Sequence, residues 1–262
     1  MAARAIWKGE LSLGATKLPV KLYAAIQDRD IHFHVLQKKT GARVKQSMVS
    51  KRDETVETKT VRKGYEIEPG SFVLLEDDEL DKLKPKESRS ITLKRFVPMA
   101  ALSHEWYERG YYLGPDGSDA DYFAFVEALG KSNLLGITQW TMRGRAYVGA
   151  LRVESECLLL VKLRYAEEIL PAEELTAGTA RPLDTKELRM AEQLVDVLAG
   201  PFNPEEFHDE YSKRLHDFID AKAKGKHPRL AAVKNHPPGG PLEEQLAKSL
   251  VALRPAGRRK VA

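Results

Sequence analysis

The stretch Leu18-Pro-Val-Lys-Leu-Tyr23 decides the fold class, because its side chains alternate between apolar and polar. Alternation with a period of two is typical of a β-strand that buries one face. The same pattern in Ile31-His-Phe-His-Val35 predicts another such strand. Other segments of strand character are Ala5–Leu13, Phe72–Leu75, Ile91–Val97, Tyr111–Leu113, Ile137–Met142, Val148–Val153 and Leu158–Tyr165. So many short strands predict a β-barrel or a sandwich.

Helical patterns interrupt the strands and then replace them. We predict helices at Asp77–Leu83 and Asp119–Leu129 within the strand-rich part. Further on, Asp184 and Glu187 have the spacing of a capping box, and the helix they begin should end at Gly200. Asn203 as N-cap, with proline at the next position, predicts one more helix, with an apolar stripe of Phe207, Tyr211, Leu215, Phe218 and Ile219.

Charge is unevenly distributed along the 262 residues, although the formal net charge is only +4. Residues 31–63 hold nine Lys and Arg against three Asp and Glu, and residues 225–262 hold eight against two. Residues 64–90 reverse the sign, with eight acidic side chains and four basic ones. Local potential rather than net charge recruits nucleic acid, so the two basic segments indicate a polyanionic partner.

The segment from 36 to 64 differs from the strands around it, because its apolar side chains are too sparse to anchor it in a core. Folded back as a two-stranded ribbon it would reach about 45 Å, at about 3.3 Å per residue. A basic arm of that reach could clamp a DNA duplex. A solvated loop fits the composition equally well.

Residues 225–262 are predicted to form a flexible basic tail that ends in a short amphipathic helix. The linker, up to Pro241, is rich in Gly and Pro, and the helix carries a leucine stripe of Leu242, Leu246, Leu250 and Leu253. Such a narrow apolar face cannot fold alone at this length. The helix docks either on its own chain or on a partner, and its position on a linker favours the partner.

Motifs for catalysis are missing. The sequence holds no phosphate loop, dinucleotide fingerprint or nucleophile turn, so we expect no enzymatic activity, no catalytic residue and no cofactor. His32 and His34 lack a third ligand nearby, so we expect no metal site. Cys157 begins an apolar run and is predicted to be a small buried side chain rather than a nucleophile. No apolar run of about 18 residues and no secretory signal occurs, so we expect a cytoplasmic protein without membrane contact, associated with the nucleoid when bound to DNA.

Several multi-residue segments, in the same order, resemble the bacterial Ku family, the DNA-end-binding proteins of non-homologous end joining. The likeness covers about Ala3 to Gly225. The segments that carry it are Ala5-Ile-Trp-Lys-Gly9, Leu18-Pro-Val-Lys-Leu-Tyr23, Lys63-Gly-Tyr-Glu66, Arg109-Gly-Tyr-Tyr-Leu113 with Pro115, Gly136-Ile137 leading to Met142-Arg143, Ala150-Leu-Arg152, Leu163-Arg-Tyr-Ala166, Met190-Ala-Glu-Gln-Leu194, Gly200-Pro-Phe202 and His208-Asp-Glu-Tyr211.

This resemblance implies a mixed β and α fold: a β-barrel core with a projecting basic arm or bridge, and a helical C-terminal arm. We assign residues 1–180 to the barrel core with its DNA-encircling arm (about 36–64), 181–224 to the helical arm and 225–262 to the tail. The resemblance also implies sequence-independent binding of double-stranded DNA ends by a ring-shaped homodimer. The ring would protect the ends and recruit or stimulate an ATP-dependent DNA ligase.

Phosphate contacts are expected from three sets of basic residues. They are Lys38, Lys39, Arg43, Lys45, Lys51 and Arg52 in the arm, Lys94, Arg95, Arg143 and Arg145 at strand ends of the barrel, and Lys226, Arg229, Lys234, Arg258, Arg259 and Lys260 in the tail. The leucine stripe is expected to dock the ligase. Two alternatives remain: a general chromatin- or RNA-binding barrel without end specificity, and, less favoured, a metal-dependent nuclease using Glu76, Asp77 and Asp78.

Overall fold

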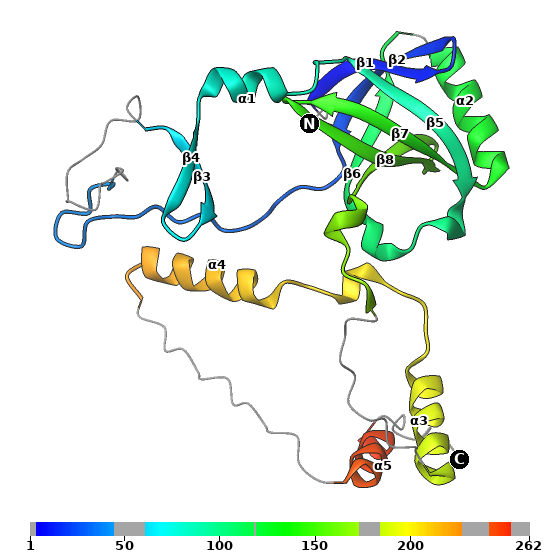
Figure 1. Cartoon of the computed structure of the whole chain (residues 1–262). Helices are drawn as coiled ribbons and strands as arrows, with labels where there is room; N and C mark the ends of the chain where they lie inside the picture. Colours follow the sequence, from blue (N-terminus) through cyan, green and yellow to red (C-terminus); the bar gives the residue numbers. More distant parts are fainter. Residues whose placement is uncertain (1–3, 45–60, 118, 173–183, 227–240, 253–262) are drawn as a thin grey trace. The chain divides into compact units, whose positions relative to one another are not determined.

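The computed structural model describes residues 4–44, 61–117, 119–172, 184–226 and 241–252 (Figure 1). The chain divides into two compact units, Met1–Glu174 and Leu175–Ala262. Within the described ranges, no helix is both long enough and apolar enough to cross a membrane.

A closed barrel forms most of the first unit, with its strands in the order β1-β2-β6-β9-β8-β7-β5 (Figure 1). Its strands are β1 (Trp7–Leu13), β2 (Thr16–Ala24), β5 (Ser90–Pro98), β6 (Tyr107–Pro115), β7 (Leu134–Met142), β8 (Arg145–Glu154) and β9 (Cys157–Leu163). Neighbouring strands pair antiparallel except β1 and β5, whose parallel pairing closes the barrel. The barrel core and the helical C-terminal region expected from the sequence are confirmed.

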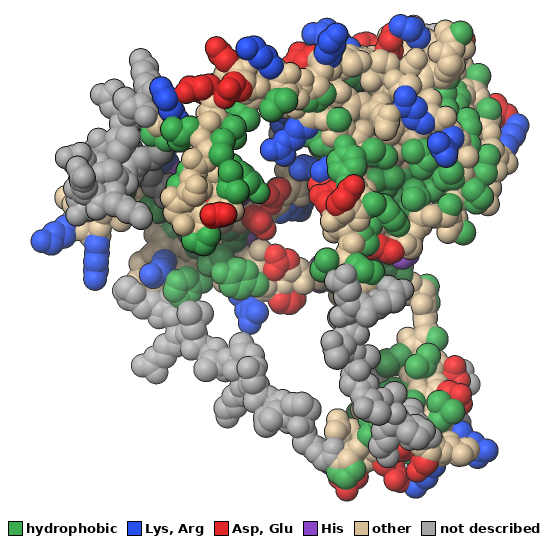
Figure 2. Space-filling view, viewed as in Figure 1, with side chains coloured by type: hydrophobic (Ala, Val, Ile, Leu, Met, Phe, Trp, Pro, Cys, Tyr) green, Lys and Arg blue, Asp and Glu red, His purple; other side chains and the backbone are tan. Residues whose placement is uncertain are grey.

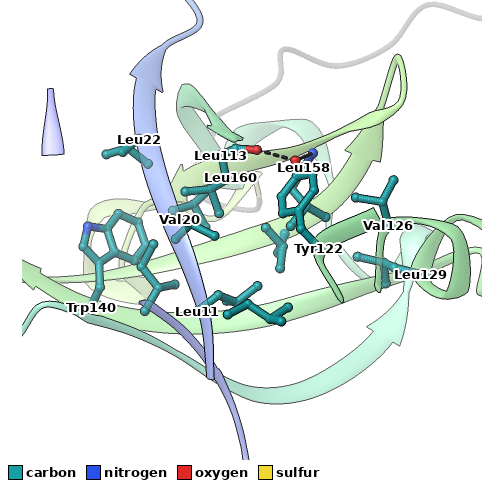
Figure 3. Close-up of a cluster of buried hydrophobic side chains, with 13 residues drawn as sticks. Leu11, Val20, Leu22, Leu113, Tyr122, Val126, Leu129, Trp140, Leu158 and Leu160 are labelled. Carbon is teal, nitrogen blue, oxygen red and sulfur yellow. Dashed lines mark hydrogen bonds between the residues drawn. The ribbon is translucent and has the colours of Figure 1, made fainter. Parts of the chain in front are cut away.

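Alternating apolar side chains fill the barrel, since every second residue of a strand faces inward. Leu11, Val20 and Leu22 are almost fully buried in this core (Figure 3). Helix α2 (Asp119–Ser132) adds Tyr122, whose hydroxyl donates to the carbonyl of Leu113 and accepts from the amide of Leu158 at 2.9 Å. The sequence prediction of this helix is therefore confirmed, with its C-terminus three residues further on.

One predicted strand is wrong. Residues 31–35 form no strand, and the apolar side chains of Phe33 and Val35 are 68% and 67% exposed. Alternation marks a possible buried face, but burial also needs a neighbouring strand, and none of the described strands pairs with this segment. His32 and His34 are exposed there.

A separate two-stranded ribbon is formed by β3 (Lys63–Glu68) and β4 (Ser71–Leu75). The helix α1 (Asp77–Leu83) follows it directly, as predicted, and begins with a capping box between Glu76 and Glu79. Ion pairs tie the ribbon to the helix: Arg62 lies 3.1 Å from Glu76, and Lys63 lies 3.0 Å from Asp77.

Three helices form the described part of the second unit: α3 (Thr185–Leu198), α4 (Glu210–Ala223) and α5 (Leu242–Ala252). The predicted capping box of α3 is present, since the Asp184 side chain accepts from the amides of Lys186 and Glu187 at 2.7 and 2.9 Å. The helix predicted to start after Asn203 starts instead at Glu210, so the predicted start is wrong.

Asn203 caps only the 3-10 turn Pro204–Glu206, because a second N-cap follows it. The Asp209 side chain accepts from the amide of Ser212 at 2.9 Å and begins α4 at Glu210, which leaves Phe207 outside the helix. Helix α5 matches the predicted amphipathic segment, except that Leu253 lies outside the described residues.

Candidate nucleic-acid interface

The first residues of the predicted arm form a tight turn. The amide of Gly41 donates to the carbonyl of Gln37 at 2.8 Å, and Leu36 pairs with Arg43. Gly41 has a φ of +68°, which lets the chain reverse there without strain. The turn therefore presents Lys38 and Lys39 at its tip, and both side chains are exposed. Lys45, Lys51 and Arg52 lie outside the described residues.

A polar groove runs over the barrel surface where β5 and β7 pair. The first of its two hollows has a volume of about 290 Å³. Its polar lining comes from Ser88, Ser90, Thr92, Lys94, Gln139 and Thr141, and the rest of its lining from Trp140, Ala146, Tyr147, Val148 and Tyr165. Thr92 and Gln139 are direct cross-strand neighbours, so the hydroxyl and the amide are held side by side by the sheet.

The second hollow, of about 280 Å³, adjoins the first through the shared residues Ser88 and Thr141. It adds two cations, Arg89 and Arg143, and one carboxylate, Glu87. Arg143 stands at the turn between β7 and β8, where Arg143 and Gly144 have φ angles of +52° and +70°. Two successive positive φ angles make the tight hairpin turn that holds the arginine at its tip.

The four barrel residues predicted to contact DNA lie on two strands and one turn: Lys94 and Arg95 on β5, Arg143 at the turn between β7 and β8, and Arg145 at the start of β8. Lys94 sits at a β-bulge, where the register of β5 against β7 shifts between Leu93 and Arg95. A bulge re-aims its side chain, and Lys94 lines the first hollow. Arg95 pairs with Ile137, and Arg145 pairs with Met142 at the start of β8. Both are exposed but line neither hollow.

Ion pairing separates these cations from the other lysines of the barrel. Lys21 lies 2.6 Å from Asp116, and this bond raises the pKa of Lys21 and lowers the pKa of Asp116. Lys17 pairs with Glu10 at 2.8 Å, and Lys162 with Glu108 at 2.7 Å. By contrast, the described part of the chain offers no carboxylate partner to a set of five cations: Arg89, Lys94, Arg95, Arg143 and Arg145. These five residues, the unpaired cations, have no ion pair in the described part of the chain that an anion from outside would have to break.

Sequence reasoning missed most of the polar groove. Arg89 was not singled out, nor were the hydroxyl groups beside it. The signal was present in Ser88-Arg-Ser-Ile-Thr-Leu-Lys94, where polar side chains alternate with apolar ones and every outward position can donate a hydrogen bond. Hydroxyl, amide and cationic donors side by side are the groups that contact phosphates in nucleic-acid backbones.

The ribbon β3–β4 adds an apolar surface that the sequence analysis did not foresee. Tyr65, Ile67, Phe72 and Leu74 are 57–68% exposed, and Figure 2 shows hydrophobic side chains gathered along the ribbon. In contrast to the barrel, both faces of the ribbon are open to solvent in the described chain. An exposed apolar ribbon is typical of an interaction surface.

Other candidate sites give weaker signals. The Sγ of Cys157, half-buried rather than buried, donates to the carbonyl of Glu154 at 3.1 Å, and burial raises the pKa of the thiol. Glu76 and Asp77 pair with Arg62 and Lys63. Among the described residues, no three His, Cys, Asp or Glu side chains gather as they would to hold a metal ion.

The predicted tail residues are mostly outside the described ranges. Lys226 is described and exposed, whereas Arg229, Lys234, Arg258, Arg259 and Lys260 are not described. Of the leucine stripe, Leu246 is 9% exposed, Leu250 is half-buried and Leu242 is 42% exposed.

Comparison with known proteins places these features in context. The family model of the Ku70/Ku80 beta-barrel domain matches residues 12–190. A non-homologous end joining protein Ku 2 from Geotalea uraniireducens is 36% identical over 86% of this chain and 88% of its own. The non-homologous end joining protein Ku of Solibacter usitatus is 33% identical over 99% of this chain and 100% of its own length. The non-homologous end joining protein Ku of Mycobacterium tuberculosis is 32% identical over 85% of this chain and 84% of its own length.

Proposed function

The chain belongs to the Ku family, and on that premise we propose that it binds the ends of double-stranded DNA in non-homologous end joining. The observation that carries this proposal is the set of unpaired cations on a Ku-type barrel, of which Arg89, Lys94 and Arg143 line the two hollows beside hydroxyl donors. These groups suit phosphates, which carry no sequence information. A protein with such a site binds any break alike and needs no catalytic group or cofactor.

Contacts to the phosphates come from the barrel and from the arm. Lys38, Lys39 and Arg43 are exposed in the described part of the arm, and Lys45, Lys51 and Arg52 follow them in sequence. Binding through many phosphates releases counterions, so affinity falls steeply as salt rises. The basic tail residues Lys226, Arg229, Lys234, Arg258, Arg259 and Lys260 add nonspecific attraction.

We further propose that the protein acts as a homodimer. A two-stranded ribbon is at best marginally stable alone in water, and β3–β4 exposes apolar side chains on both faces. A second copy of the same ribbon would bury them through a two-fold contact, which closes on itself and leaves no edge for further copies. Two arms joined in this way form a ring around the duplex.

A ring gives specificity for ends through topology, because a closed ring can thread only onto a free end. The test compares competition by linear DNA and by covalently closed circular DNA of the same sequence against a labelled linear duplex. We expect the linear form to compete at least tenfold better per mass of DNA. Equal competition would show a general chromatin- or RNA-type binding barrel. Degradation of the linear DNA in Mg²⁺ or Mn²⁺ would instead reveal a nuclease.

We propose a separate role for each segment of the chain. Residues 1–180 form the barrel and arm, 181–224 the helical arm, and 225–262 a tail that recruits an ATP-dependent DNA ligase through Leu242, Leu246, Leu250 and Leu253. Replacing Leu246 and Leu250 with Asp keeps every basic residue and removes the apolar face. We expect unchanged binding to ends and reduced stimulation of the ligase. Full stimulation by this double variant would leave the tail as an electrostatic extension only.

A further inference from the structure

The middle of the leucine stripe of α5 is already covered in this chain. Leu246 is 9% exposed, and α3 is the helix that packs against α5. At one end of the pair, Lys186 of α3 forms an ion pair with Glu243 of α5, and the hydrogen bond to that carboxylate raises the pKa of Lys186. The stripe that would recruit a partner therefore lies against the chain's own helix.

Helix α3 offers a matching stripe. Its least exposed side chains are Glu187, Met190, Ala191 and Leu194, spaced i, i+3, i+4 and i+7 on one face. Glu187 is 8% exposed, and its carboxylate accepts from the amide of Asp184 at 3.2 Å, so its burial within this face leaves no polar group unsatisfied. The opposite face carries the charged residues Arg189, Glu192 and Asp196. Leu188 and Val195, to one side of the stripe, are 47% and 68% exposed. Helix α5 thus fits one particular face of α3.

Helix α5 is only marginally stable as an isolated helix. Helix α5 has 11 residues, and isolated helices shorter than about 12 residues are marginal in water. Its helical form depends on an apolar surface that covers the leucines. That surface is α3 in the free chain, and a partner's groove could replace it, but one face of α5 cannot contact both at once.

We infer that α3 is a docking site for one amphipathic helix, that α5 of the same chain fills it in the absence of a partner, and that a partner protein binds the leucine stripe only after α5 has left α3. The last clause rests on the proposed function of the tail. Residues 225–241 join α5 to the end of α4, and a tether of this kind holds a helix at an effective concentration of about 1 mM. A partner at micromolar concentration thus competes with α3 at a disadvantage.

The docking itself can be tested without any partner. A carbodiimide joins a contacting lysine and carboxylate without a spacer, so the full chain should yield a Lys186–Glu243 cross-link detectable by peptide mass spectrometry. Leu246→Asp keeps both reactive groups and should lower the yield at least tenfold. The control Val195→Asp changes an exposed side chain of α3 beside the stripe, 68% accessible, and should leave the yield unchanged.

Two results would overturn the docking. One is an undiminished cross-link in Leu246→Asp. The other comes from mixing ¹⁵N-labelled and unlabelled protein: cross-links that combine the two isotopes as often as chance predicts would place α5 on a second copy rather than on its own chain. We expect only cross-links within one isotope.

Whether α3 blocks access of a partner to the leucine stripe is tested by substituting one leucine on each side of the α3–α5 contact. Leu194→Asp damages the face of α3 but leaves the leucine stripe intact, so it should release α5. If α5 is docked about nine-tenths of the time, the released stripe binds the partner about tenfold more tightly. With an ATP-dependent end-joining ligase as probe, half-maximal stimulation should need about tenfold less ligase for Leu194→Asp, whereas Leu246→Asp should lose stimulation.

These outcomes separate the two proposals. If Leu246→Asp stimulates the ligase normally while its cross-link is lost, the tail does not recruit the ligase, although α5 does dock on α3. If Leu194→Asp loses the cross-link but needs as much ligase as the unaltered protein, α3 does not mask the stripe.

Discussion

The polar groove on the barrel makes a quantitative prediction about salt. Lys94 lines its first hollow and Arg143 its second, and neither has a carboxylate partner in the described part of the chain. Replacing both with Gln removes two cations from each copy and four from a dimer. The logarithm of the affinity falls with the logarithm of the salt concentration by about 0.9 for each phosphate that a protein neutralises.

The size of the effect follows from that slope. Between 50 and 200 mM salt, each phosphate contact contributes about a 3.5-fold loss of affinity, so four contacts contribute about 150-fold. The unaltered protein should therefore lose affinity over this range by about two orders of magnitude more than the Lys94→Gln, Arg143→Gln variant. At 50 mM salt the variant should bind more weakly, and the two curves should converge as salt rises.

Fluorescence anisotropy with a labelled blunt duplex, repeated at several salt concentrations, measures both slopes. The matched control is Lys17→Gln with Lys131→Gln, which makes the same change of charge at lysines paired with Glu10 and Glu127. Its slope should equal that of the unaltered protein, and thermal unfolding should show that both variants are folded. Equal slopes for the groove variant and the unaltered protein would refute a phosphate site in the groove.

Further predictions concern the arm, the ribbon and the core. Lys39→Glu with Arg43→Glu should weaken binding to duplexes of unrelated sequence by the same factor, as anisotropy can measure, and a sequence-dependent loss would argue for base contacts. Phe72→Asp with Leu74→Asp should give a monomer by light scattering at micromolar concentration, whereas Leu83→Asp, which changes an exposed leucine off the ribbon, should stay dimeric; a dimeric ribbon variant would place the interface elsewhere. Tyr122→Phe removes the hydroxyl that bonds Leu113 and Leu158 and should lower the free energy of unfolding by about 1–3 kcal/mol in urea titrations, with half-exposed Tyr112→Phe as a near-neutral control.

The barrel strands could be predicted because alternation is a local signal. Leu18, Val20 and Leu22 alternate with polar neighbours in the sequence, and they are the residues that fill the core. The same signal failed at Phe33 and Val35, since the sequence does not show whether another strand will pair with a segment. The start of α4 was missed for a related reason: two good N-caps, Asn203 and Asp209, stand six positions apart, and each begins its own element.

The candidate interface was only partly predictable, because the charge of a residue is visible in the sequence but its partner is not. Lys17 and Lys94 are the same residue type on strands of the same barrel. The first pairs with Glu10 across the β1–β2 hairpin, where the register places Glu10 and Lys17 two rungs apart on the same face of the sheet. The second sits at a bulge, whose position depends on how β5 meets β7. Lys94 and Arg143 were selected as basic residues at strand ends on the strength of the family resemblance, which does not show which lysines are neutralised by a carboxylate and which overlooked the neutral hydroxyls.

The binding surface of the leucine stripe could not be predicted from its sequence pattern. The spacing of Leu242, Leu246 and Leu250 identifies an apolar face that must pack against another surface. The spacing does not show which surface that is. The sequence left a choice between docking on the same chain and docking on a partner, and the contact with α3 answers only for the free chain. Because the apolar face is narrow, the two states exclude each other, and their balance depends on the partner's concentration relative to that of the tethered helix. A helix that is too short to be stable alone is suited to such an exchange. It loses its helical structure when it leaves one apolar surface and regains it when it binds another.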